Sequence, residues 1–131
     1  MITYSESIDG IERRHLDGFL VGWPHPPSPE THLRLLASSD HIVLAIDVES
    51  AQVIGYVTAL TDGVLSSFIP LLEVLPAYQG RGIGQALMTR MLDWLGHLPN
   101  VDLLCDPGVV PFYERFGMRP CGGMVLRRPM G

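Results

Sequence analysis

The fold is decided by one stretch of the chain, Leu71-Leu72-Glu73-Val74-Leu75-Pro76-Ala77-Tyr78-Gln79-Gly80-Arg81-Gly82-Ile83-Gly84-Gln85-Ala86-Leu87. A strand pattern runs into a glycine-rich turn, and the turn runs into a segment with helical spacing. Glycines at positions 80, 82 and 84 let the backbone approach a ligand closely, and the unpaired amides of a helix N-terminus complement phosphate. The stretch therefore predicts a loop that binds phosphate.

Three kinds of phosphate loop compete for this pattern. A Walker loop ends in Gly-Lys-Ser/Thr, and the chain contains no lysine. A dinucleotide fingerprint needs its third glycine where Gln85 stands, and it belongs to a parallel strand-helix-strand unit. The third is the acyl-CoA pyrophosphate loop, with the pattern Gln-x-x-Gly-x-Gly that Gln79, Gly82 and Gly84 supply. The Arg81 guanidinium either reaches a phosphate or lies in solvent as a surface charge.

The flanking segments predict an α+β fold, or α/β in looser naming. Apolar spacing predicts helices over 11–20, 29–38, 84–95 and 109–116, and strands over 2–4, 42–46, 53–60, 64–75, 101–105 and 124–126. Ser28 and Pro29 mark the start of the second helix, and Gly96 ends the third. This order predicts a mixed, mostly antiparallel central sheet with helices on both faces.

Composition excludes several classes of protein. A length of 131 residues predicts one domain over 1–131. The net charge of −5 argues against a nucleic-acid partner, and no apolar stretch approaches the length of a membrane span. Two cysteines, Cys105 and Cys121, cannot build a disulfide framework, and the five histidines lack metal-site spacing. We therefore expect a soluble, cytoplasmic protein without a metal site, with Cys105 a small core residue.

Two segments together resemble the GNAT superfamily of acetyl-CoA-dependent N-acetyltransferases. Val74 to Gly84 matches the family's central motif, and Val110 to Met118 is similar to its Phe-Tyr-x-x-x-Gly-Phe segment, with Met118 in place of the usual aromatic residue. The match is close over 65–118, and residues 1 to 40 match only as variable helices. The resemblance implies the fold, an acyltransferase activity and acetyl-CoA as co-substrate.

The resemblance also implies how acetyl-CoA binds. The pantetheine arm pairs with exposed backbone of the strand before the loop, and the pyrophosphate lies over the loop amides. Gln79 either contacts the ligand or supports the loop. The residues assigned to the cofactor are Leu72, Glu73, Val74, Gln79, Gly80, Arg81, Gly82, Ile83, Gly84, Gln85, Asp106 and Tyr113.

Acetylation of an amine needs a proton acceptor, if the amine arrives protonated, and a proton donor for the leaving thiolate. The resemblance places the Tyr113 hydroxyl near the thioester sulfur, which makes Tyr113 the general acid. Glu73 alternates with Leu72 and Val74, so its carboxylate faces away from the core, as a base beside a substrate cleft or as a solvated group. Asp106 and a water chain are the other candidates for the general base.

Trp23 and His25 lie in a proline-rich loop where relatives form one wall of the acceptor pocket. We therefore expect an N-acetyltransferase that acts on a primary amine, of a small molecule or a peptide, by direct attack in a ternary complex. The acidic balance favours a cationic acceptor. The alternatives are a non-catalytic acyl-CoA-binding sensor with the same fold and a nucleotide-binding module. The expected assembly is a monomer or a homodimer.

Overall fold

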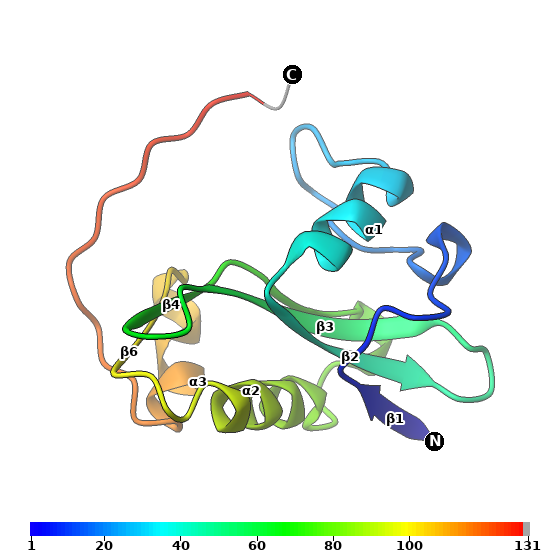
Figure 1. Ribbon diagram of the computed structural model, residues 1–131. Coiled ribbons are helices and arrows are strands. Elements are labelled where there is room, and N and C mark those ends of the chain that lie inside the picture. The colour runs from blue at the N-terminus through cyan, green and yellow to red at the C-terminus, as the bar shows by residue number, and fades with distance from the viewer. Residues whose placement is uncertain (130–131) are drawn as a thin grey trace.

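A computed structural model describes residues 1–129 and shows a mixed six-stranded sheet with helices on both faces (Figure 1). The strands are β1 (Ile2–Ser5), β2 (His41–Asp47), β3 (Val53–Thr61), β4 (Ser66–Ile69), β5 (Leu72–Val74) and β6 (Asn100–Leu103). The helices are α1 (Pro29–Ser38), α2 (Ile83–Trp94) and α3 (Val110–Glu114), with 3-10 turns η1 (Arg13–His15), η2 (Pro76–Tyr78) and η3 (Pro107–Val109). The fold class predicted from the sequence is confirmed.

The sheet divides in two along one edge of β3. The strand order is β1-β2-β3-β4-β6, with β5 also pairing with β3, and every pair is antiparallel except β4 with β6. β4 pairs with Leu60 and Thr61 of β3, whereas β5 pairs with residues 55–57. Pro70 lies at the break, where it offers no N–H for pairing. The prediction of a single strand over 64–75 is therefore wrong. The segment forms two strands, and β6 pairs with β4 rather than with β5.

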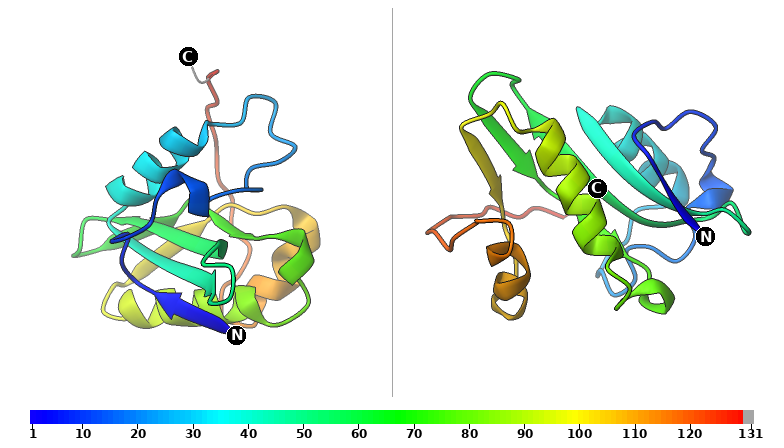
Figure 2. Two further views of the ribbon diagram at one scale, coloured as in Figure 1. Left: turned by 90° about the vertical axis from the view of Figure 1, so that its right-hand side faces the viewer. Right: turned by 90° about the horizontal axis from the view of Figure 1, so that it is seen from below.

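Alternation along β2 builds one apolar core on each face of the sheet. Val43 and Ala45 pack on the α2 side, and Ile42 and Leu44 pack on the α1 side with Leu36. Figure 2 shows α1 and α2 on opposite faces. The strand period of two residues therefore explains why both faces carry a helix.

The helix starts follow from local chemistry. The Ser28 hydroxyl accepts a hydrogen bond from the Thr31 amide at 3.1 Å, and Pro29 occupies the first helical position of α1, as predicted. α2 begins after Gly82, whose φ of 79° is left-handed. That conformation costs little only at glycine.

Several predicted elements are wrong or shorter. The helix expected over 11–20 is only the turn η1, because Gly18 and Leu20 adopt positive φ (91° and 62°) and redirect the chain. The helix expected over 109–116 is η3 followed by α3, and β6 ends before Cys105, which is exposed rather than buried. The segment 124–126 forms no strand, because nothing pairs with it among residues 1–129. No helix within residues 1–129 has the length and apolar character needed to cross a membrane.

Candidate functional site

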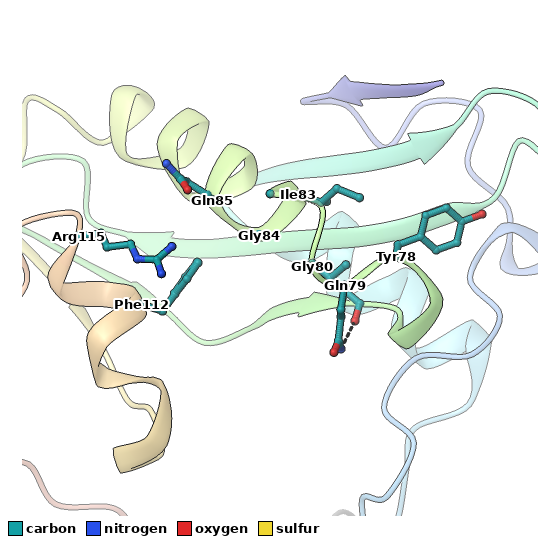
Figure 3. A pocket seen from close by; sticks show the side chains of 10 residues that line it. Tyr78, Gln79, Gly80, Ile83, Gly84, Gln85, Phe112 and Arg115 are labelled. Atoms are coloured by element: carbon teal, nitrogen blue, oxygen red, sulfur yellow. Dashed lines mark hydrogen bonds between the residues drawn. The ribbon is translucent and has the colours of Figure 1, made fainter.

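An open hollow lies where the end of β5 meets the N-terminus of α2 (Figure 3). It brings together the glycine loop, the end of β5 and one face of α3. The lining residues are Val74, Tyr78, Gln79, Gly80, Gly82, Ile83, Gly84, Gln85, Phe112 and Arg115. Most of the residues that the sequence predicted for phosphate thus share one surface.

The glycines of this loop keep the surface open. Gly80 and Gly82 both adopt a φ of 79°, and a Cβ atom at either would meet nothing within 4 Å. Glycine is therefore required there by the backbone conformation rather than by crowding. At Gly84 a Cβ atom would lie 3.6 Å from the Phe112 ring, which places α3 against the first turn of α2.

The first turn of α2 exposes uncapped amide donors. Gly82 precedes the helix and offers no side chain, and the first turn contains no acidic residue. The first intrahelical bond runs from the Ala86 amide to the Gly82 carbonyl at 3.0 Å. The amides of Ile83, Gly84 and Gln85 therefore have no helical acceptor, and the helix dipole adds positive potential. This arrangement suits an anion such as a phosphate.

Two side chains hold the loop in place. The Gln79 side-chain amide donates to the Val74 carbonyl at 2.9 Å, drawn as a dashed line in Figure 3. The Tyr78 hydroxyl donates to the Asp47 carboxylate at 2.6 Å, and this bond lowers the pKa of Asp47 and raises the pKa of Tyr78. The Gln79 hydrogen bond supports the loop, which is one of the two roles considered for Gln79, and Gln79 also lines the hollow.

The cation that lines the hollow is not the one expected from the sequence. The Arg81 guanidinium lies 5.2 Å from the centre of the Tyr78 ring, and Arg81 does not line the hollow. Arg115, the residue directly after α3, lines it instead and lies beside Phe112 of α3 (Figure 3). Sequence reasoning missed these two residues, although their spacing of three places them on one helix face.

The backbone of β5 presents a free edge beside the hollow. The Thr58 amide donates to the Leu71 carbonyl, and the Leu75 amide donates to the Ile54 carbonyl, so alternate residues of this segment face β3. Leu72 and Val74 consequently direct their N–H and C=O groups away from β3. Within the described part of the chain, only the Val74 carbonyl accepts a hydrogen bond, from Gln79. Of the three residues predicted to pair with a ligand here, Glu73 faces β3 through its backbone.

The Glu73 side chain points to the face opposite α2, as its alternation predicted. One carboxylate oxygen accepts from the Tyr56 hydroxyl at 3.3 Å, and the other accepts from the Leu20 amide at 3.1 Å. Leu20 is buried and has a left-handed φ of 62°, which is costly for leucine. Glu73 therefore tethers the loop that continues to Trp23 and His25.

An aromatic cluster, buried at His32 and Tyr56 and partly buried at Phe19, packs behind the Glu73 carboxylate. Phe19, His32 and Tyr56 pack with ring centroids 5.0–5.6 Å apart. Burial and the adjacent Glu73 charge raise the pKa of Tyr56, so its hydroxyl stays protonated as a donor. Burial lowers the pKa of His32, whose Nε2 has no hydrogen-bond partner among residues 1–129. No sequence motif predicts this cluster, because its members lie far apart along the chain.

The other predicted residues lie outside the hollow. Tyr113 is half-buried on α3, and burial, followed by the neighbouring Cys105, raises the pKa of its hydroxyl. The hydroxyl is thus protonated at neutral pH. Asp106 is exposed at the start of η3, and Trp23 and His25 are exposed in the loop beyond Leu20. The described residues contain no cluster of three or more metal-ligating side chains.

Comparison with known proteins identifies relatives over most of the chain. The model of the acetyltransferase (GNAT) family matches residues 8–118. A putative acetyltransferase from Deinococcus radiodurans R1 has a crystal structure that superposes with a TM-score of 0.93 at 47% identity, covering 97% of this chain and 88% of that one.

Curated relatives are named for different acceptors. Histone acetyltransferase TAP1 from Glycine max is 29% identical, over 74% of this chain and 46% of its own length. Serotonin N-acetyltransferase 2, chloroplastic, from Oryza sativa subsp. japonica is 31% identical, over 74% of this chain and 50% of its own length. The match thus spans about half the length of these relatives, and the acceptor differs among them.

The tether between Glu73 and Leu20 yields a prediction. Replacing Glu73 by Ala removes the acceptor of the Leu20 amide, so hydrogen exchange at this amide should become about tenfold faster. Amide exchange followed by NMR measures this effect. Glu49→Ala, an exposed substitution in the turn after β2, is the matched control and should leave Leu20 unchanged. Unchanged exchange at Leu20 in Glu73→Ala would contradict the tether.

Proposed function

Because this chain belongs to the GNAT family of acetyltransferases, we propose that it transfers an acetyl group from acetyl-CoA to a primary amine. The proposed reaction is direct attack of the amine on the thioester in a ternary complex. The observation that supports it best is the uncapped N-terminus of α2, which lies beside the free edge of β5 with two left-handed glycines between them. The chain is proposed to act as a single domain over residues 1–131.

In this proposal the backbone binds most of the cofactor. The pyrophosphate lies over the amides of residues 80–85, and the pantetheine arm pairs with the free backbone groups of Leu72 and Val74. Arg115 supplies a cation to the phosphates in place of the Arg81 side chain. Gln79 serves this site by holding the loop, and Asp106 remains a candidate contact from η3.

The break in the sheet at Pro70, between β4 and β5, sets the proposed place of reaction. A thioester held along the edge of β5 has Glu73 on the α1 side of the sheet and α3, with Tyr113, on the α2 side. Tyr113, whose raised pKa keeps its proton at neutral pH, donates that proton to the leaving thiolate. Glu73 takes up the proton of the substrate's ammonium group, directly or through water. Much of the rate enhancement comes from holding the two substrates together.

The acceptor is proposed to enter from the side of the Glu73 tether. Trp23 and His25 follow Leu20, which Glu73 anchors, and they form one wall of the pocket for the acceptor amine. A net charge of −5 and the Glu73 carboxylate favour a cationic amine, of a small molecule or a peptide. The second candidate function, a non-catalytic acyl-CoA sensor, is favoured by the two hydrogen bonds that already occupy Glu73. It predicts tight acetyl-CoA binding without amine-dependent release of CoA.

Replacing Gly82 by Val tests the phosphate loop. The added side chain would enter the open surface at a φ of 79°, so acetyl-CoA affinity should fall by more than about tenfold. Isothermal calorimetry measures this change. Gly63→Val is the matched control, because Gly63 has a φ of 76°, equally open surroundings and a position in a distant turn. Equal affinities of the two folded variants would contradict the assignment of the loop.

The role of Tyr113 is tested by its phenylalanine variant. Tyr113→Phe should lower kcat by about 100-fold to 10,000-fold and change acetyl-CoA affinity only a few-fold, because the hydroxyl acts on the leaving thiolate. Steady-state kinetics with thiol detection and calorimetry provide the two numbers. Tyr4→Phe, on the outer strand β1, should match the parent protein. Parental turnover by Tyr113→Phe at every pH would remove Tyr113 from the mechanism.

A pH profile separates the chemical role of Glu73 from its tether. If Glu73 accepts the ammonium proton, kcat/KM of Glu73→Gln should be most depressed below the pKa of the acceptor amine and should recover as pH rises. Tyr56→Phe removes one hydrogen bond to the same carboxylate and keeps its charge, so its profile should run parallel to that of the parent. A parallel profile for Glu73→Gln would leave Asp106 or a water chain as the base.

A further inference from the structure

The glycine loop between η2 and α2 is anchored at both ends. Ile83, at the end that enters α2, is buried in the core beneath the helix. Tyr78, at the other end, is partly buried, and its hydroxyl donates to the Asp47 carboxylate at 2.6 Å. The residues between these anchors, 79–82, include two glycines with a left-handed φ of 79°. The two anchors therefore limit how far this loop can move.

The hydrogen bond between Tyr78 and Asp47, which we call the tyrosine clamp, joins the loop to the end of β2. Asp47 precedes Tyr78 by 31 positions in the chain. Within the described part of the chain, every other hydrogen bond made by residues 76–82 joins groups no more than 5 positions apart. Because the acceptor is a carboxylate, the clamp is a charge-assisted bond, which is about twice as strong as a bond between neutral groups.

The Asp47 carboxylate is itself held in one orientation. Its other oxygen accepts from the Glu49 amide at 3.0 Å. The Asp47 carbonyl accepts from the Ala51 amide at 2.8 Å, and the Asp47 amide donates to the Gln52 carbonyl at 3.0 Å. Asp47 is therefore fixed within the turn between β2 and β3. A carboxylate that is already ordered in this way loses little entropy when it holds Tyr78.

The Tyr78 ring also contacts the one side chain that lies between the two left-handed glycines. The Arg81 guanidinium lies 5.2 Å from the centre of this ring, within the range of a cation–π contact. Figure 3 shows Tyr78 on the opposite side of the loop glycines from Phe112 and Arg115. A single aromatic side chain therefore fixes both the backbone that enters the loop and the Arg81 side chain.

We propose that Asp47 is a positioning residue for acetyl-CoA, which acts through Tyr78 to hold the amides of residues 80–82 where they bind the pyrophosphate. The inference rests on the proposed binding of acetyl-CoA at this loop. Asp47 does not line the hollow, so its effect passes through the clamp. Glycine loses more conformational freedom on ordering than any other residue. A glycine loop that is ordered before the ligand arrives therefore binds that ligand more tightly.

Tyr78→Phe tests the clamp and keeps both Asp47 and the ring beside Arg81. NMR order parameters of residues 80–82 in the ligand-free protein should fall. The Kd for acetyl-CoA should rise about tenfold, and kcat should stay within a few-fold of the parent value. Tyr4→Phe is the matched control, because the Arg90 guanidinium lies over the Tyr4 ring at 3.9 Å, and it should match the parent.

Each failure of this test has a different meaning. Unchanged order parameters in Tyr78→Phe overturn the clamp even before a ligand is added. Reduced order with an unchanged Kd for acetyl-CoA overturns the positioning role and leaves the proposed function in place. A parent protein that does not bind acetyl-CoA contradicts the proposed function, and the positioning role fails with it.

Variants of Asp47 separate positioning from stability. Asp47→Ala should weaken acetyl-CoA binding by a similar factor of about ten, and adding Tyr78→Phe should weaken it no further, because both changes remove the same bond. Asp47→Asn keeps an acceptor for the Tyr78 hydroxyl and should recover part of the affinity. Asp62→Ala is the matched control, because the Asp62 carboxylate accepts from backbone amides in the turn after β3. It should lower the melting temperature and leave the Kd unchanged.

S-acetylpantetheine shows which part of the ligand the clamp serves. This compound carries the thioester and the arm but no phosphate, so its affinity should be equal in the parent, Tyr78→Phe and Asp47→Ala. Calorimetry with acetyl-CoA and NMR titration with S-acetylpantetheine give the two affinities. Losing both ligands equally would indicate a general disturbance of the site, and additive losses in the double variant would indicate two separate effects. Either result overturns the positioning role.

Discussion

The candidate site depends on backbone groups that the fold leaves without partners, and one break in the sheet produces them. At Pro70 the chain leaves β4 and re-joins β3 as β5, while β6 stays with β4. The outer edge of β5 consequently has no neighbouring strand among the described residues, and the chain passes from it through η2 into the uncapped end of α2. Unsatisfied amides and carbonyls demand partners, and here a ligand can supply them. Side-chain identity matters less than the absence of side chains at Gly80 and Gly82.

β5 also links the α2 core to the opposite face of the sheet, where the proposed acceptor loop is held. Leu72 and Val74 anchor it to the α2 core, and Glu73 reaches the opposite face, where it holds Leu20 and Tyr56. The carboxylate proposed as a base is thus part of the structure that places the acceptor loop. A substitution of Glu73 changes both the proposed base and the anchor of the loop. Separate variants are therefore needed to test its charge and its hydrogen bond to Leu20.

The sequence predicted elements that local chemistry determines. The turn at Gly80 to Gly84, the helix that follows and the cap at Ser28 all occur where expected, because glycine conformation and capping act over a few residues. The predictions failed where partners distant in sequence decide. Pro70 divides a long apolar run into two strands. Leu20, whose amide donates to Glu73, adopts a turn conformation instead of continuing a helix. The segment 124–126 lacks a pairing strand within residues 1–129. Arg115 and the Tyr56 cluster were missed because only the fold brings them to the site.

The claim that backbone amides at the start of α2 bind the cofactor's phosphates can be measured residue by residue. The most direct measurement is a titration of the labelled protein followed by amide NMR, first with CoA and then with pantetheine, which shares the arm but lacks the pyrophosphate. CoA should shift the amides of residues 80–85 together with those of Leu72 and Val74, and pantetheine should shift only the latter pair. Saturable binding of CoA that leaves the amides of residues 80–85 unmoved would contradict the account.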